Sequence, residues 1–165
     1  MNFKTKKYQV IRGALSRELA DFNFNYMMLQ RDAVDFMEKH YKLNPVNFFI
    51  GKRNDPQVPG PYSKYSDWAM ETLLIYMIPI MKAKTGMDLV PTYSFTRLYE
   101  KGNILKRHKD RPSCEVSTTL HLGGDEWPIF LDPSGGDFVI DEFKNIHKPG
   151  APKGIQVDLK VGDML

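Results

Sequence analysis

The sequence predicts a mixed α+β fold in which two N-terminal helices brace one face of a β-rich core. Two observations predict it. Apolar residues recur at steps of three and four in the first half of the chain, which is typical of helices. After Gly86, short β-rich runs alternate with turns, which is typical of a β-sandwich or barrel. The 165 residues suit one domain, with a helical support region at residues 1–88 and the β-rich core at residues 89–165.

The two helices are expected from apolar spacing and capping residues. Ser16 is a suitable N-cap for the first helix, whose apolar stripe is expected to pack in the core. The second helix is expected from about Asp67 to Lys84 and is ended by Gly86; it is apolar almost all round and should be well buried. Pro79 should kink this helix or end its regular part early. The stripe of the first helix consists of Leu19, Phe22, Tyr26, Leu29, Ala33, Phe36 and His40.

The other segments are expected to form one long loop and several short strands. Residues 41–65 are rich in turn formers and should wrap the surface or form a lid. Because a strand that stops after two residues would leave an open edge, the chain is expected to be a C-terminally truncated fragment. The expected strands are Tyr8–Arg12, Val90–Leu98, Ile104–Arg107, Val116–Leu122, Trp127–Leu131, Phe138–Ile140 and Ile155–Leu159, with Met164 and Leu165 starting one more.

Composition and charge exclude several classes of protein. The chain is 42% hydrophobic and 12% aromatic, which is enough to bury a substantial core. A net charge of +3 is too mild to argue for a nucleic-acid partner. Cys114 is the only cysteine, so neither an intramolecular disulfide nor a Cys-based zinc cluster is possible. No segment resembles a signal peptide or a membrane span, so a soluble cytoplasmic protein is expected.

The segment that indicates chemistry contains His108 and Asp110. Residues two apart on a strand or its exit point to the same side, so this imidazole and carboxylate could converge on one cation. Non-haem Fe(II) oxygenases bind the metal through two histidines and one carboxylate on one face. Taken alone, the pair fits a solvated charge cluster at Arg107–Arg111 better than a metal site.

The context of the pair points to a known family. Tyr99 and Gly102 precede His108 and Asp110 in an order and spacing that resemble the prolyl-4-hydroxylase-like branch of the Fe(II)/2-oxoglutarate-dependent dioxygenases. The likeness is greatest to uncharacterised phage and bacterial members. It covers the whole chain, with the specific part confined to residues 95–132. This resemblance implies a double-stranded β-helix core, jelly-roll or cupin-like, whose last strands are missing here.

The resemblance also implies cofactors and site residues. His108 and Asp110 would be the catalytic iron ligands, and Tyr99 and His121 would contact the co-substrate. The implied cofactors are Fe(II) and 2-oxoglutarate, with ascorbate as a candidate reductant, and the implied reaction hydroxylates a substrate and releases succinate. Tyr99 fits an ordinary strand tyrosine about equally well. His121 is expected on the same strand face as Ser117 and Thr119. This polar row could face a water-filled cavity or, nearly as well, bulk solvent.

The chain departs from the family in two respects. The second metal histidine and the basic residue that pairs with the distal carboxylate of 2-oxoglutarate both come after the strand that Met164 begins, and neither is present. His147 precedes that strand in a turn-rich loop and is expected at the surface, and His40 is expected to pack half-buried. With two protein ligands the chain should bind metal poorly and be inactive or nearly so.

Two other classes of protein stay open. The chain also fits a non-catalytic double-stranded β-helix module that serves binding or structure. A cupin-like protein that binds a sugar or a small acid fits the fold but leaves the spacing from Tyr99 to Asp110 unexplained. The substrate, a protein side chain or a small metabolite, and the oligomeric state have no readable signal in the sequence.

Overall fold

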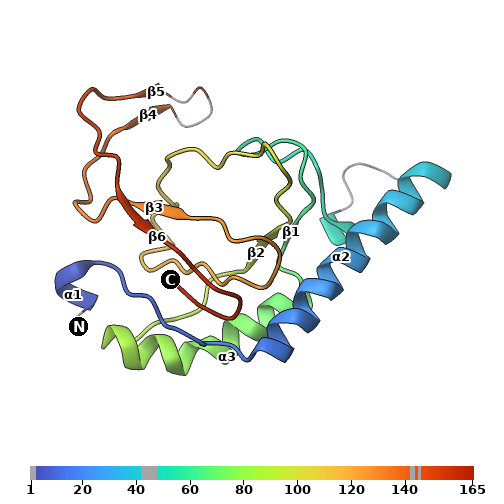
Figure 1. The fold of residues 1–165 in the computed structure, drawn as a ribbon, viewed down its shortest axis with the longest axis horizontal. Helices are drawn as coiled ribbons and strands as arrows, with labels where there is room; N and C mark the ends of the chain where they lie inside the picture. Colours follow the sequence, from blue (N-terminus) through green and yellow to red (C-terminus); the bar gives the residue numbers. More distant parts are fainter. Residues whose placement is uncertain (1–2, 42–47, 142–143, 145) are drawn as a thin grey trace.

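Two long helices lie along one side of the molecule, and the short strands lie on the other (Figure 1). The computed structural model describes residues 3–41, 48–141, 144 and 146–165. Over these residues the fold is mixed α+β, which confirms the predicted class. Its helices are α1 (Phe3–Lys6), α2 (Arg17–His40) and α3 (Trp68–Thr85), with a 3₁₀ turn, η1, at Phe48–Ile50.

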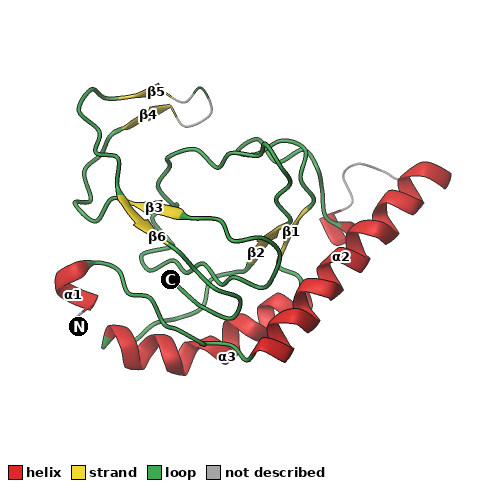
Figure 2. Cartoon of the chain, viewed as in Figure 1, coloured by secondary structure: helices red, strands yellow, loops and turns green. Residues whose placement is uncertain are grey.

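The strands of the described residues are two or three residues long and pair in antiparallel ladders (Figure 2). Two of the ladders are nested: the β4–β5 hairpin lies, along the chain, inside the pairing of β3 with β6. The third joins β1 to β2, with Ser63 opposite Arg97. The strands are β1 (Ser63–Tyr65), β2 (Phe95–Arg97), β3 (Ile129–Leu131), β4 (Val139–Asp141), β5 (Ile146–His147) and β6 (Ile155–Val157).

Met164 joins the beginning, middle and end of the chain. It pairs with Ile11 on one side and with Leu120 on the other. Backbone hydrogen bonds of 3.0 and 2.9 Å between Thr119 and Leu165 continue the second pairing. Along the chain, the β3–β6 and β4–β5 ladders both lie between Leu120 and Met164. The pairing of these two residues is therefore a third nested pairing outside the other two. Met164 is thus paired on both sides and is 1% exposed.

The turn before Met164 is fixed by close packing and a buried carboxylate. Gly162 has φ of 88°, and a Cβ at this position would lie 2.4 Å from the carbonyl oxygen of Leu15, so only glycine fits. Asp163 is buried and forms an ion pair with Arg12 at 2.5 Å. These contacts attach the C-terminal turn to the segment that leads into α2.

The helices begin and end largely as their capping residues predict. The Ser16 hydroxyl accepts a hydrogen bond from the Leu19 amide, and the Asp67 carboxylate accepts one from the Ala69 amide. Gly86 ends α3 in the left-handed conformation. The helix runs through Pro79 to Thr85, so the expected early end of its regular part is wrong. Within the described ranges, no helix combines the length and apolarity needed to cross a membrane.

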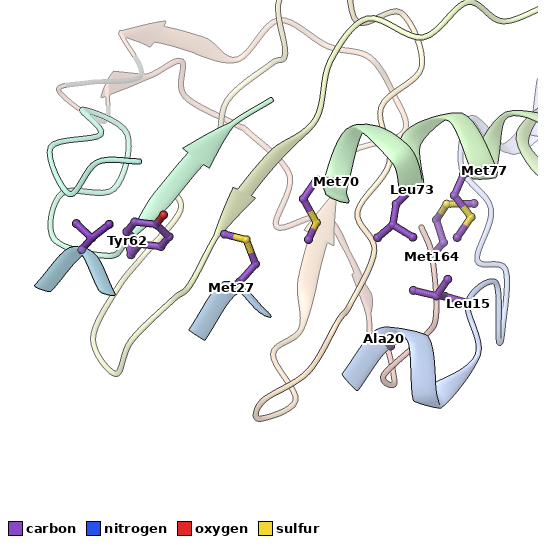
Figure 3. Packing of buried hydrophobic residues seen from close by; sticks show 9 residues of the cluster. Leu15, Ala20, Met27, Tyr62, Met70, Leu73, Met77 and Met164 are labelled. Atoms are coloured by element: carbon purple, nitrogen blue, oxygen red, sulfur yellow. The ribbon is translucent and has the colours of Figure 1, made fainter. Parts of the chain in front are cut away.

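The core lies between α2, α3 and the Met164 segment (Figure 3). Side chains from elements far apart in the sequence pack together here, and this packing holds the helices against the rest of the chain. Most of them are small or flexible, and methionine adapts well to irregular gaps. The buried cluster consists of Leu15, Ala20, Met27, Val34, Tyr62, Met70, Leu73, Met77 and Met164.

Both long helices bury less of their predicted apolar surface than expected. In α2 most of the expected core stripe points outward, with Phe22, Leu29 and Phe36 66%, 69% and 57% exposed, while Tyr26 packs against the core. In α3, which was expected to be buried almost all round, Trp68 and Ile75 are 86% and 56% exposed. Both helices have apolar residues on more than one face, so periodicity alone could not select the face that packs. The buried face of α2 carries Ala20, Asn23, Met27 and Val34.

Three predicted strands are not present as strands. Tyr8–Arg12 and Val116–Leu122 each contribute one bridge residue, and Ile104–Arg107 is irregular, with Ile104 68% exposed. β-propensity describes side chains that suit a half-buried pleat, and it needs a neighbouring strand to take effect. Of the predicted loop at 41–65, residues 42–47 lie outside the described residues, and the remainder contains η1 and β1.

Candidate functional site

The side chains of His108 and Asp110 lie next to each other in the irregular segment that follows β2. Nε2 of His108 is 3.6 Å from Oδ1 of Asp110. The other ring nitrogen, Nδ1, is 2.8 Å from the carbonyl oxygen of Lys106. Nδ1 is thus directed at a backbone carbonyl and Nε2 at the carboxylate, so each ring nitrogen faces an oxygen. A metal-binding histidine is commonly oriented in this way.

Asp110 is arranged to carry a negative charge. The hydrogen bond with His108 lowers the pKa of Asp110, burial raises it, and a hydrogen bond donated by the Ser117 hydroxyl lowers it again. The net result is a pKa below the ordinary value of an aspartate. The carboxylate is therefore ionised at neutral pH, the form in which it binds a cation.

One imidazole and one carboxylate supply two of the three protein ligands that a non-haem iron site uses. Among the described residues, no group of three or more His, Cys, Asp or Glu side chains is placed to hold a metal ion. The donor set of His108 and Asp110 thus fits iron in kind, and it is one ligand short in number. Solvent or a small ligand would have to fill the remaining positions.

Tyr99 lies two residues after the end of β2, and its hydroxyl is beside Arg97. Nη1 of Arg97 donates a hydrogen bond of 2.8 Å to the Tyr99 hydroxyl, and the ring of Trp127 meets the Tyr99 ring edge-on at 4.4 Å between centroids. These contacts fix the direction of the phenol. The hydroxyl retains acceptor and donor capacity for a further partner.

His121 is held by the backbone through both ring nitrogens. Nδ1 lies 2.9 Å from the carbonyl oxygen of Leu159, and Nε2 lies 3.0 Å from that of Gly123. In this arrangement the ring links two segments of the core. His121 therefore lies between two backbone segments. To contact the co-substrate, as predicted, one ring nitrogen would have to move away from its carbonyl oxygen.

The remaining two histidines lie on other elements. His147 is partly buried in β5, where it stands opposite Val139. His40 ends α2 and is exposed, with its ring 4.4 Å from that of Phe36. The half-buried packing expected for His40 is therefore wrong, because the end of α2 extends past the body of the molecule (Figure 1).

A cleft lies beside the segment that leads to His108. It has a volume of about 270 Å³ and lies between the loop at 56–59 and the segment at 102–106. A separate small hollow of about 10 Å³ is lined by Gln57 and residues 105–108. The residues that line the cleft are Pro56, Gln57, Val58, Pro59, Gly102, Asn103, Ile104 and Lys106.

A buried ion pair holds the cleft loop against β2. Arg97 and Asp55 lie 3.0 Å apart, with side chains only 6% and 8% exposed. Burial raises the pKa of Asp55, but hydrogen bonds from the Gln57 amide and from Arg97 lower it, and the net pKa is below the ordinary value. Because Arg97 also binds Tyr99, one guanidinium connects the loop, the strand and the predicted co-substrate tyrosine.

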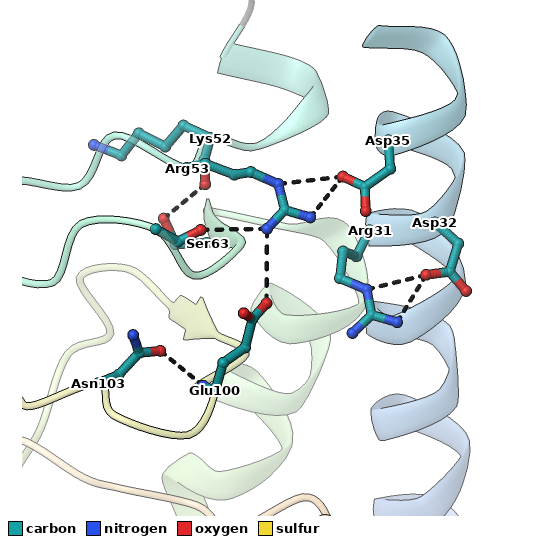
Figure 4. Close-up of polar contacts among 9 residues, drawn as sticks. Arg31, Asp32, Asp35, Lys52, Arg53, Ser63, Glu100 and Asn103 are labelled. Carbon is teal, nitrogen blue, oxygen red and sulfur yellow. Dashed lines mark hydrogen bonds and ion pairs between the residues drawn. The ribbon is translucent and has the colours of Figure 1, made fainter. Parts of the chain in front are cut away.

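A second arginine ties the same loop to the helix side. Arg53 contacts Asp35 of α2 at 2.5 Å, the carbonyl of Gly60 at 3.2 Å and Glu100 at 3.8 Å (Figure 4). Sequence reasoning missed both arginines, and no local pattern could have found them. Their carboxylate partners lie far away in the sequence: Asp35 is 18 positions from Arg53, and Asp55 is 42 positions from Arg97.

Comparison of the chain with protein-family models, with curated proteins and with solved structures finds no match in any of the three. The function is therefore argued from the residues of the site.

Proposed function

We propose that this chain carries the metal-binding part of an Fe(II)- and 2-oxoglutarate-dependent dioxygenase of the prolyl-4-hydroxylase-like type. The observation that carries the proposal is the pairing of His108 Nε2 with Asp110 Oδ1 at 3.6 Å, with Nδ1 directed at the Lys106 carbonyl. In this orientation Nδ1 has a backbone partner and Nε2 lies on the side of the carboxylate, as in a metal-binding histidine. The cleft of about 270 Å³ between residues 56–59 and 102–106, in the segment that leads to His108, is a place where a small molecule could bind.

The core of such an enzyme is proposed to be a double-stranded β-helix. The nesting of the antiparallel pairings supports it: Val139 with His147, outside these Ile129 with Val157, and outside these Leu120 with Met164. A jelly roll is formed by antiparallel strands of this kind that wrap into two facing sheets. The compartment is proposed to be the cytoplasm, which suits the free thiol of Cys114.

Each residue of the site has a role in this proposal. His108 and Asp110 would hold the iron, which when bound supplies the activation of oxygen for oxidation of a C–H bond. The Lys106 carbonyl, as acceptor of a hydrogen from Nδ1, would favour the tautomer in which Nε2 is the metal-binding nitrogen. Ser117 orients the carboxylate. Arg97 fixes the Tyr99 hydroxyl and the loop that forms one wall of the cleft.

The activity of the chain itself should be very low. An imidazole supplies a large share of the affinity for a first-row divalent ion, so two ligands should hold Fe(II) much more weakly than three. We therefore expect succinate release from 2-oxoglutarate that barely exceeds that of the His108→Ala variant. Turnover at ordinary enzyme rates would overturn the expectation of a nearly inactive chain.

Added imidazole tests whether the pair is an incomplete iron site. Free imidazole can act as an external third ligand, and we expect it to raise Fe(II)-dependent succinate release by the chain. The same addition should leave Asp110→Asn unchanged, because that variant keeps one ligand. An increase that is equal in both proteins would show that the pair does not hold the metal.

A non-catalytic binding module is the second candidate, and one observation favours it. No described group of side chains completes the metal site. A small acid that binds in the presence of EDTA, with an affinity unaffected by His108→Ala, would support this candidate. Thermal-shift measurements with 2-oxoglutarate, with and without Fe(II), distinguish the two.

A further inference from the structure

The outward face of α2 carries large apolar side chains at every seventh position. Phe22, Leu29 and Phe36 are each more than half exposed, at 66%, 69% and 57%. The core-facing side of the same helix carries Ala20 and Met27, both fully buried. Residues seven apart lie nearly in line, because two turns of about 3.6 residues separate them. Phe22, Leu29 and Phe36, the α2 stripe, thus form a straight apolar row on the side away from the core.

Trp68 adds exposed apolar surface next to the middle of α2. The preceding residue, Asp67, accepts hydrogen bonds from Tyr26 at 3.1 Å and from Gln30 at 3.0 Å, so α3 begins against α2. The side chain of Trp68 is nevertheless 86% exposed. Single exposed apolar residues need no explanation, but a row of aromatic and aliphatic side chains on one face marks an interaction surface.

The α2 stripe is complementary to itself when a second copy runs antiparallel. With a two-fold axis at Leu29, this residue meets its own counterpart, and Phe22 meets Phe36 of the other copy. A two-fold interface uses the same patch on both copies, which this spacing satisfies. α2 has 24 residues, about 36 Å at a rise of about 1.5 Å per residue, which is long enough for several such layers.

The charges at the two ends of α2 favour the same arrangement. The first turn carries Glu18 and Arg17, the latter paired with Asp21 of the same helix at 2.8 Å, and the last turn carries Glu38, Lys39 and His40. Glu38 lies two residues past Phe36, which turns it away from the α2 stripe. In an antiparallel pair Glu18 lies beside Lys39 of the other copy, because Glu18 precedes Phe22 by one turn and Lys39 follows Phe36 by nearly one. The helix dipoles are also opposed. A parallel pair would instead bring the two Glu18 side chains together and align the dipoles.

We propose that the exposed face of α2 binds a second copy of this chain, as an antiparallel helix pair with a two-fold axis at Leu29 and Trp68 at its edge. The proposal is independent of the function of the His108–Asp110 site.

Disulfide cross-linking tests the register. The background is Cys114→Ser, which removes the only cysteine. On oxidation, Leu29→Cys alone should form a covalent dimer, and an equal mixture of Phe22→Cys and Phe36→Cys should form a mixed dimer. Phe22→Cys alone should form no disulfide-linked dimer, because the two copies of residue 22 lie at opposite ends of the pair. Efficient cross-linking of Phe22→Cys alone, as a parallel pair requires, would overturn the proposal.

The oligomeric state tests the surface itself. In sedimentation equilibrium we expect the chain to be a dimer and Leu29→Glu to be a monomer with an unchanged helical circular-dichroism signal. The matched control is Val90→Glu, which places the same charge at another residue, 82% exposed, and should stay dimeric. A monomeric wild-type chain, or the same behaviour of both variants, would contradict the proposal.

Charge reversal tests the contribution of the charged ends of α2 independently of the α2 stripe. Glu18→Lys should weaken dimerisation roughly tenfold, because two such contacts form per dimer and become repulsive. Adding Lys39→Glu should restore the dissociation constant. A double variant as weak as the single one would rule out the antiparallel pairing of these ends.

Discussion

The helix side and the site side of the molecule are held together by different forces. On the helix side, side chains such as Met27, Tyr62 and Met164 are 0%, 0% and 1% exposed and pack against one another. On the site side the strands are two or three residues long, and ion pairs such as Arg97–Asp55 connect the segments. Apolar burial is nondirectional and tolerates rearrangement, whereas a buried ion pair depends on both partners. The helix side is thus stabilised mainly by apolar packing, and the site side depends more on paired charges.

Removal of the buried arginine should give the largest effect. Arg97→Met leaves the Asp55 carboxylate buried without its partner, which should lower the free energy of unfolding by roughly 4 kcal/mol. Urea denaturation measures it. Addition of Asp55→Asn removes the stranded charge and should recover more than half of the loss. If Arg97→Met lowered the free energy of unfolding only by the small amount usual for an exposed salt bridge, the buried Arg97–Asp55 pair would not have the proposed role.

Truncation in the apolar core should give a somewhat smaller effect of a different kind. Met27→Ala leaves a cavity at a fully buried position and should cost roughly 3 kcal/mol. Because no charge is stranded, the loss should be the same at low and high salt. Urea denaturation in both conditions checks this. A matched truncation on the outward face, Leu29→Ala, should change the stability of the monomer far less.

Acid should weaken the helix side through Asp67. Burial raises the pKa of Asp67, but hydrogen bonds from Gln30 and Lys64 outweigh it and leave the pKa below its ordinary value. A depressed folded-state pKa gives stability above the unfolded-state pKa of about 3.9, and this stability is lost as pH falls through the folded-state value. Asp67→Asn should lower the free energy of unfolding at pH 7. Below pH about 4 this free energy should fall less steeply in the variant than in the wild type, as urea denaturation at several pH values can measure. A parallel decline in variant and wild type would contradict this role.

Removal of the Ser117 hydroxyl should give the smallest effect on stability and a clear one on metal. Ser117 is exposed, so Ser117→Ala should change the free energy of unfolding by less than about 0.5 kcal/mol. It should weaken Co(II) binding roughly tenfold, because groups that orient a ligand commonly have effects of this size. Thr119→Ala, also exposed and two residues further along, is the control and should bind Co(II) like the wild type.

The elements that the sequence predicts well are those with local causes. Ser16, Asp67 and Gly86 each fix a helix end through their own backbone neighbourhood, and the structure confirms all three. The side-by-side arrangement of His108 and Asp110 also follows from a spacing of two residues. These features depend on geometry within a few residues.

The features that the sequence does not reveal depend on distant partners. The packing face of α2 was predicted wrongly because Met27 and Phe22 are both apolar, and the contact that selects between them comes from α3 and the Met164 segment. Strand formation at Ile104 failed to occur because no neighbouring strand pairs with it in the described structure. The Arg97–Asp55 pair joins residues 42 positions apart, which no local pattern can indicate.

Selective paramagnetic broadening by Mn(II) tests the central claim most directly. The chain has four histidines, and their ring proton signals can be assigned by substitution. At substoichiometric Mn(II) the His108 signals should broaden first, while those of His40 and His147 stay sharp, and Asp110→Asn should abolish the selectivity. Equal broadening of all the rings, or a His108 signal that Mn(II) does not affect, would show that the imidazole and the carboxylate do not bind a metal together.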